Sequence, residues 1–244
     1  DKTIYKDKLF PYWTGKSMKD SIVAAIDDEI MESVNEKIVN LNQTDKGQGH
    51  IIPGFEMILD NGLGSLIEKV SRRDSEKDFY KAAKITLEAA RDHILRYGYL
   101  ADELLKNEKN DVRKGDLKRI SAVSKKVAVE KPESFLEALQ LLWYICVILQ
   151  HESNASSISL GRIDQYLYKF YENDIKSGVP KEELKEYLEA FYIKTNDVVM
   201  VRSSHSAKFF AGFPVGYTAL LGGLTPEGRS SVNELSYLCL EAYK

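Results

Sequence analysis

The sequence predicts a mainly helical fold with a few short strands. Apolar residues recur at spacings of three and four over several long segments, which is the pattern of amphipathic helices. Glycine and proline residues separate these segments, and a run near residues 218–223 has the continuous apolar character of a short buried strand. The 244 residues, 43% of them apolar, are enough for a sizeable core. No internal repeat or linker divides them, so we expect one unit over residues 1–244.

The first half of the chain contains five segments with helical spacing. The first opens with a serine, a common N-terminal cap, and a glycine-rich stretch around His50 separates it from two short helices. A long amphipathic helix follows, and the charged residues 106–114 are typical of a solvated helix end and loop. Helices are therefore expected over Ser17–Asn40, Phe55–Leu59, Gly64–Val70, Ser75–Lys106 and Asp116–Val127.

The second half begins with a helix from Pro132 to Gln150. This helix is apolar around most of its circumference, so we expect it to be buried on nearly all sides. A polar break follows from His151 to Ser159, and from Ser203 the pattern indicates a loop that leads into the short strand. Further helices are expected over Gly161–Lys176, Pro180–Asn196 and Asn233–Tyr243.

The polar break contains short hydrogen-bonding side chains that emerge directly from a buried helix. Leaving such groups buried without partners costs roughly 1 to 3 kcal/mol each, so they need partners in the chain or a polar ligand. Ser156 and Ser157 are the candidates for ligand binding. Helix capping or turn formation explains them about equally well.

Composition excludes several classes of function. Basic and acidic residues alternate and the net charge is −3, so no basic patch indicates a nucleic-acid partner. The longest apolar run, Leu141 to Leu149, is too short to span a membrane. Cys146 and Cys239 lie in apolar surroundings without disulfide or metal-ligand spacing, which is consistent with a cytoplasmic location. No phosphate-binding loop or metal cluster is visible, so we expect this chain to bind no cofactor or metal.

A series of separated motifs runs along almost the whole chain. They are Phe10-Pro11-Tyr12-Trp13, Gly49-His50-Ile51-Ile52-Pro53, Pro132, Ser134-Phe135, Glu137-Ala138-Leu139-Gln140, Gly161-Arg162-Ile163-Asp164-Gln165-Tyr166-Leu167-Tyr168, Gly212-Phe213-Pro214 and Leu221-Gly222-Gly223. In composition and order these motifs resemble those of the glycyl radical enzymes of the pyruvate formate-lyase type, specifically the glycerol and propanediol dehydratase-like branch.

The resemblance implies a ten-stranded α/β barrel with an outer layer of helices. This chain would supply outer helices and the first barrel strands. The family also needs a radical-bearing glycine near the C-terminus and a catalytic cysteine followed two positions later by glutamate, and this sequence has neither. We therefore expect an N-terminal portion of a larger enzyme. Arg96-Tyr97-Gly98-Tyr99 imitates the radical segment, but it lies inside an expected helix, where we interpret the glycine as merely tolerated.

His50 is the candidate catalytic residue. Glycines nearby let the backbone approach a ligand, and an imidazole can exchange protons near neutral pH. The resemblance to dehydrating members implies that His50 and Asn42 face the substrate. It also implies that Ser156 and Ser157 bind substrate hydroxyls and that Phe213 forms a pocket wall. Ser156 replaces a histidine and Phe213 lacks a phenolic hydroxyl, so we expect a less polar pocket than a glycerol site.

Other charged and polar residues are assigned to the architecture. Arg162 and Asp164 are two residues apart on an expected helix and do not share a face, so each should be buried with partners of its own. His93, His151 and His205 are interpreted as structural.

The expected function is that of a glycyl radical lyase or dehydratase that removes water or an amine from a small 1,2-substituted substrate, with His50 assisting proton transfer. One alternative is another glycyl radical reaction, such as hydroxyproline dehydration, decarboxylation or carbon–carbon cleavage. A carboxylate substrate would predict an arginine at the site, for which Arg202 is the candidate. The other alternative is a non-catalytic helical fragment or interaction module.

The resemblance also implies partners. The complete enzyme would act in anaerobic metabolism on a small-molecule substrate, and a radical-SAM activating enzyme would install its glycyl radical on the C-terminal part. A homodimer is compatible with this assignment. We expect the 244-residue chain alone to be inactive.

Overall fold

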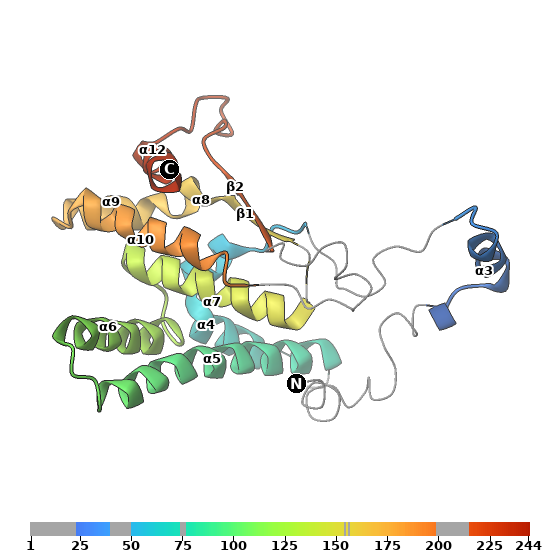
Figure 1. Ribbon diagram of the computed structural model, residues 1–244, viewed down its shortest axis with the longest axis horizontal. Helices are drawn as coiled ribbons and strands as arrows, with labels where there is room; N and C mark the ends of the chain where they lie inside the picture. Colours follow the sequence, from blue (N-terminus) through green and yellow to red (C-terminus); the bar gives the residue numbers. More distant parts are fainter. Residues whose placement is uncertain (1–22, 40–49, 74–76, 154, 156, 199–214) are drawn as a thin grey trace.

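The computed structural model describes residues 23–39, 50–73, 77–153, 155, 157–198 and 215–244. Two groups of helices lie on opposite sides of a central helix and share one core (Figure 1). The pair α5 (Asp78–Leu105) and α6 (Asp111–Val127) covers one side of the central helix α7 (Phe135–Ser153). On the other side lie α9, α10 and α12, which span Tyr168–Lys176, Lys181–Lys194 and Glu234–Tyr243. Among the described residues, no helix is long and apolar enough to cross a membrane.

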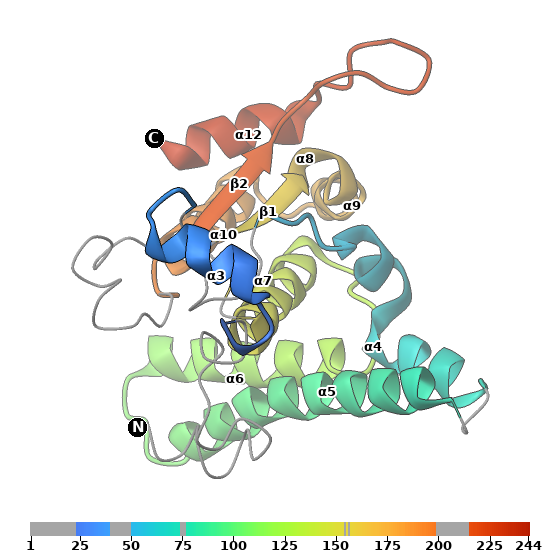
Figure 2. The same ribbon diagram turned by 90° about the vertical axis from the view of Figure 1, so that its right-hand side faces the viewer.

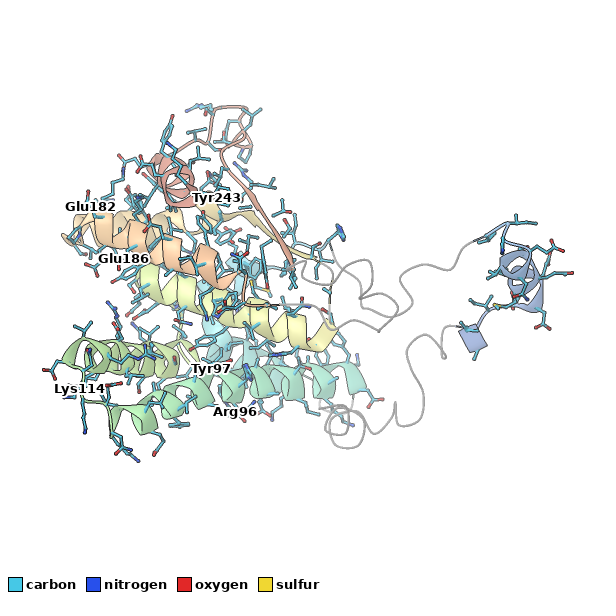
Figure 3. All side chains as sticks on the ribbon, viewed as in Figure 1. Arg96, Tyr97, Lys114, Glu182, Glu186 and Tyr243 are labelled. Atoms are coloured by element: carbon cyan, nitrogen blue, oxygen red, sulfur yellow. The ribbon has the colours of Figure 1, made fainter. Side chains whose placement is uncertain are left out.

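α7 occupies the centre because it is apolar on most of its faces. Its buried residues include Leu141, Leu142 and Cys146, each with 0% of its surface exposed, so the predicted burial is confirmed. Tyr97 projects from α5 towards α7 (Figure 3), and its ring centroid lies 5.1 Å from that of Tyr144. These contacts make α7 the element against which both groups of helices pack.

α4 (Phe55–Ser71) consists of two helical pieces joined at Gly62, where φ is 73° and ψ is 157°. This confirms the two short helices expected from the sequence. A Cβ at Gly62 would lie 2.6 Å from the backbone nitrogen of Lys131, and one at Gly64 would overlap the carbonyl oxygen of Val129. The two glycines therefore let α4 approach the backbone of the segment before α7.

Two parallel strands lie side by side at one edge of this helical body (Figure 2). β1 (Ser157–Arg162) pairs with β2 (Gly216–Leu220), with Ser157 opposite Gly216 and Ser159 opposite Thr218. The chain between the strands includes α8 (Ile163–Tyr166), α9 and α10, as a parallel connection requires. The fold is therefore mainly helical with short strands, as predicted.

The expectation for the polar break was wrong in part. α7 continues through His151 to Ser153, and the residues from Ser157 onward form β1 rather than a turn before a helix. Ile158 and Leu160 are buried whereas Ser157 and Ser159 are partly exposed, which is the two-residue alternation of a half-buried strand. The helix expected over Gly161–Lys176 is consequently replaced by the end of β1, α8 and α9.

The short strand near residues 218–223 was expected to be buried, and this was also wrong. β2 begins at Gly216 and most of its residues are exposed. Within the described part of the chain β2 pairs with β1 alone, so one of its edges has no partner there.

Two helix boundaries also differ from expectation. The helix expected over Ser17–Asn40 is interrupted in its described part, because Asp27 has the extended backbone of a cap and α3 begins after it (Asp28–Asn35). None of the residues of α3 is buried. α6 begins at Asp111 rather than Asp116, because the Asn110 side chain accepts a hydrogen bond of 3.1 Å from the Arg113 backbone N–H.

Candidate functional site

His50 lies at the start of β1 although it precedes this strand by more than one hundred residues. Its backbone N–H donates to the carbonyl oxygen of Ser157 at 3.0 Å and to the Ser157 hydroxyl oxygen at 2.9 Å. One residue further on, Ile51 forms a parallel bridge with Ile158, and its carbonyl accepts from the Ser159 N–H at 2.8 Å. The segment at residues 50–51 therefore lies along β1 on the edge that β2 does not occupy.

The backbone of His50 has a φ of 63°. This left-handed conformation is uncommon for a residue other than glycine, and it is found disproportionately at functional sites. The residue is exposed, and its backbone N–H contacts the Ser157 hydroxyl. The structure thus brings together two of the five residues that the sequence proposed for the site.

Asn42, Ser156 and Phe213 lie outside the described residues, as do Arg202 and His205. The roles proposed for these residues remain predictions. Ser156 directly precedes β1, and Phe213 precedes β2 by three positions in the sequence.

The sheet has one apolar face and one polar face. Ile158 and Leu160 belong to the core cluster, and the opposite face carries Ser157 and Ser159 from β1. The register places Gly216 and Thr218 of β2 beside these serines, and both residues are exposed. We call the face formed by Ser157, Ser159, Gly216 and Thr218 the hydroxyl face.

Sequence reasoning missed Ser159, Gly216 and Thr218 as members of this face. The alternation of serine with apolar residues from Ser157 to Leu160 was the available signal for β1. The pairing of β1 with a strand from the far end of the chain had no local signal, because register depends on tertiary contacts.

Arg162 and Asp164 hold the far end of the sheet in place. Asp164 is fully buried, and its carboxylate accepts from the Gly222 N–H at 2.6 Å and from the Ser236 hydroxyl. Arg162 donates to the carbonyl oxygen of Gly222 at 2.7 Å. Both side chains therefore secure the turn between β2 and α12. The expected structural role is confirmed, but the expectation of separate burial was wrong in part, because Arg162 is only partly buried and the two residues share Gly222 as a partner.

The two cysteines do not fit the role of a radical-bearing residue. Burial raises the pKa of the Cys146 thiol to about 12 and that of Cys239 to about 11. Both are buried, Cys146 within α7 and Cys239 within α12. They have the character of small core residues, as the sequence predicted.

Gly98 also does not fit a radical-bearing role. It lies inside α5 and is buried, and a Cβ there would be 3.0 Å from the Lys125 side chain and 3.3 Å from the Ser121 carbonyl oxygen of α6. The glycine is therefore needed for close packing of α5 on α6, which goes beyond mere tolerance in a helix. No cluster of three metal-binding side chains occurs among the residues that the structure describes.

Comparison with known proteins identifies the family. The family model described as pyruvate formate lyase-like matches residues 1–244. The chain belongs to this family.

Relatives of the pyruvate formate lyase-like chain include several dehydratases. It is 36% identical over 251 residues to the (2S)-3-sulfopropanediol dehydratase of Klebsiella oxytoca, covering 96% of this chain and 30% of the relative. Its fold is similar to that of the glycerol-bound B12-independent glycerol dehydratase from Clostridium butyricum, with a TM-score of 0.85, 33% identity and coverage of 97% and 31%. A glycyl radical enzyme from Archaeoglobus fulgidus gives a TM-score of 0.82 at 31% identity, with coverage of 98% and 32%. The chain therefore spans about a third of the length of these proteins.

Proposed function

We propose that this chain is one unit, over residues 1–244, of a glycyl radical dehydratase that removes water from a small 1,2-substituted substrate. The observation that supports this most directly is the contact of His50 with Ser157 at the start of β1. The contact is made by the His50 backbone N–H, and it holds a residue with a proton-exchanging side chain next to a hydroxyl group. Its relatives include dehydratases of sulfopropanediol and glycerol, two small hydroxylated molecules.

In this proposal each residue has a defined task. His50 donates or relays the proton that assists departure of the leaving group. Ser157 accepts from the His50 backbone N–H and would donate its own proton to a substrate oxygen. Asn42 and Ser156 add hydrogen bonds, and Phe213 forms an apolar wall that limits access of water.

The radical chemistry would come from a glycine and a cysteine outside these 244 residues, because neither Cys146 nor Cys239 fits that role. A radical-SAM activating enzyme would be the protein partner. We further propose a cytoplasmic protein of anaerobic metabolism that acts on a small molecule, is compatible with a homodimer, and binds neither nucleic acid nor membrane.

Substitution in the longer enzyme that contains this chain tests the assignment. His50→Ala should lower kcat on the order of 100-fold, the usual scale for loss of a general acid or base, while the glycyl radical still forms. Ser157→Ala should act mainly through KM, because one neutral hydrogen bond is worth about 1 kcal/mol. Steady-state kinetics and electron paramagnetic resonance measure the two quantities independently.

The exposed His151 provides a matched histidine control, and His151→Ala should leave kcat nearly unchanged. Substrates should include a diol, an amino alcohol and a carboxylic acid. Full activity of the His50→Ala enzyme on every substrate that the wild type converts would remove the proposed mechanism.

A further inference from the structure

We infer that Gly216 and Thr218 are further specificity-determining residues of the substrate site, and that the hydroxyl face takes a small substrate with several hydrogen-bonding oxygen atoms. This inference rests on the proposed function. It extends the site from the start of β1, where the sequence placed it, across to β2.

The hydroxyl groups of this face differ in whether their protons are already engaged. The Ser159 hydroxyl donates to the carbonyl oxygen of Thr218 at 3.0 Å, so its proton is engaged within the sheet. The Ser157 oxygen accepts from the His50 backbone N–H, and among the described residues its own proton has no acceptor. Thr218 is exposed beside Ser159 and provides a second hydroxyl on the same face.

Gly216 leaves space beside Ser157. Gly216 lies opposite Ser157 in the register, and a Cβ at this position would be 3.3 Å from the Ser157 Cβ. That distance is tighter than ordinary van der Waals contact, so alanine would displace Ser157 by a few tenths of an ångström, and a larger side chain would cover its hydroxyl. The backbone of Gly216 does not have a positive φ, so it does not need the left-handed conformation that favours glycine. The requirement for glycine here is therefore one of space and not of backbone conformation.

The separation of Ser157 and Thr218 limits the size of the ligand. Neighbouring strands are about 4.8 Å apart, and residues on one face of a strand repeat about every 6.6 Å. The Cα atoms of Ser157 and Thr218 should then be about 8 Å apart across the diagonal of the sheet. A substrate that reaches both hydroxyls is a molecule of a few heavy atoms with oxygens at both ends, and bare backbone at Gly216 leaves room for its middle.

Thr218 and Gly216 make different contributions in this arrangement. Thr218 would contact the substrate directly and is a binding residue. Gly216 acts through Ser157 and is a positioning residue. Neither is expected to take part in proton transfer, so both should influence KM more than kcat.

The test uses the longer enzyme of the proposed function. Thr218→Val removes the hydroxyl at nearly constant volume and should raise KM about 5- to 10-fold, the scale of one lost hydrogen bond, and Thr218→Ser should restore it. Gly216→Ala should raise KM by a similar factor. Gly216→Val should raise it by on the order of 100-fold, because its side chain covers the Ser157 hydroxyl and also fills the space proposed for the middle of the substrate. In each case kcat should change less than about twofold.

Matched controls are present in the chain. Gly115 lies in α6 with nothing within 4 Å of an added Cβ, and Thr86 is an exposed residue of α5 whose hydroxyl bonds to its own helix. Gly115→Ala and Thr86→Val should leave both kinetic constants unchanged. If Gly216→Ala does not fold, the Thr218 pair still decides the question.

The outcomes separate this inference from the proposed function. A raised KM in Ser157→Ala together with unchanged kinetics in Thr218→Val and Gly216→Ala would overturn the inference and leave the proposed function standing. Unchanged kinetics in Ser157→Ala as well would overturn both. A raised KM in Thr218→Val that Thr218→Ser does not restore would show that the hydroxyl is not the group recognised.

Discussion

His93 is a half-buried histidine between two helices of the core. Its Nδ1 lies 3.1 Å from the Arg96 guanidinium, and because arginine can only donate, this nitrogen accepts. Its ring stands nearly perpendicular to that of His151 on α7, with centroids 5.9 Å apart. Burial lowers the pKa of His93 below its ordinary value of 6.5, and electrostatic repulsion from Arg96 and His151 lowers it further. The folded protein therefore favours the neutral imidazole.

This lowered pKa predicts a loss of stability in mild acid. At pH values between the pKa of His93 in the folded protein and 6.5, the unfolded chain binds a proton at His93 that the folded chain does not. The contribution of His93 to the free energy of unfolding is thus fully present above pH 6.5 and falls as the pH drops through the folded pKa. The melting temperature of the 244-residue chain should therefore decrease as the pH is lowered from about 7.5 to about 5.5.

His93→Phe, which retains an aromatic ring but cannot titrate, should show a smaller decrease over the same interval. Carboxylates with lowered pKa, such as Asp102 and Glu108, lose their contribution at lower pH, because their ordinary values are 3.8 and 4.5. Identical pH profiles for the wild type and His93→Phe would contradict the prediction.

At the scale of single residues, the sequence could name His50 and Ser157 but not their contact. Glycines around His50 and the serine-rich break marked both positions as polar and accessible. The hydrogen bond that joins them starts from a backbone N–H whose direction depends on a φ of 63°. A conformation of that kind is maintained by the surrounding structure, so sequence pattern does not reveal it.

At the scale of elements, the approach of α4 to the backbone of residues 129–131 predicts a strong requirement for glycine. The Gly64 N–H donates to the Val129 carbonyl oxygen at 3.1 Å, and an added Cβ would overlap that same oxygen. Neither backbone can move freely, because α4 and α7 both contribute to the core. Gly64→Ala should therefore lower the free energy of unfolding by about 1–3 kcal/mol through overpacking.

Chemical denaturation of purified protein measures this effect. The control is Gly115→Ala in α6, where nothing lies within 4 Å of the new Cβ and where alanine should raise stability by about 0.5–1 kcal/mol. Equal shifts of the urea midpoint in the two variants would show that the contact of α4 with residues 129–131 is looser than the structure indicates.

The helices were predictable where their own sequence determines them. The ends of α7, α10 and α12 lie within about three residues of the expected ends, because apolar spacing and local caps define these helices. Asn233 illustrates this, since its side chain accepts from the Ser236 N–H at 3.0 Å in a capping box. β1 was missed because its serines resemble a turn until the buried Ile158 and Leu160 are considered with them.

At the scale of the whole molecule, the parallel sheet shows what single-chain patterns do not determine. Parallel sheets are normally covered on both faces. β2 has the apolar run that predicted burial, yet most of its residues are exposed in this chain. Burial depends on what lies against a strand, and the relatives are about three times as long as this chain. The sequence of neither strand therefore predicts the hydroxyl face, which is defined by the pairing of β1 with β2.

Whether the 244 residues can hold a radical on their own also depends on the fold of the whole molecule. The segment Arg96-Tyr97-Gly98-Tyr99 resembles a radical-bearing glycine loop in sequence, but the structure places Gly98 within α5 and buries it against α6. Cys146 and Cys239 are both buried thiols with raised pKa values. We expect no glycyl radical signal by electron paramagnetic resonance when the purified chain is incubated anaerobically with an activating enzyme. A full-length glycerol dehydratase treated in parallel with its own activating enzyme should give the signal and so validate the assay. A doublet from the 244-residue chain that disappears in Gly98→Ala would overturn the assignment of that segment to a packed helix.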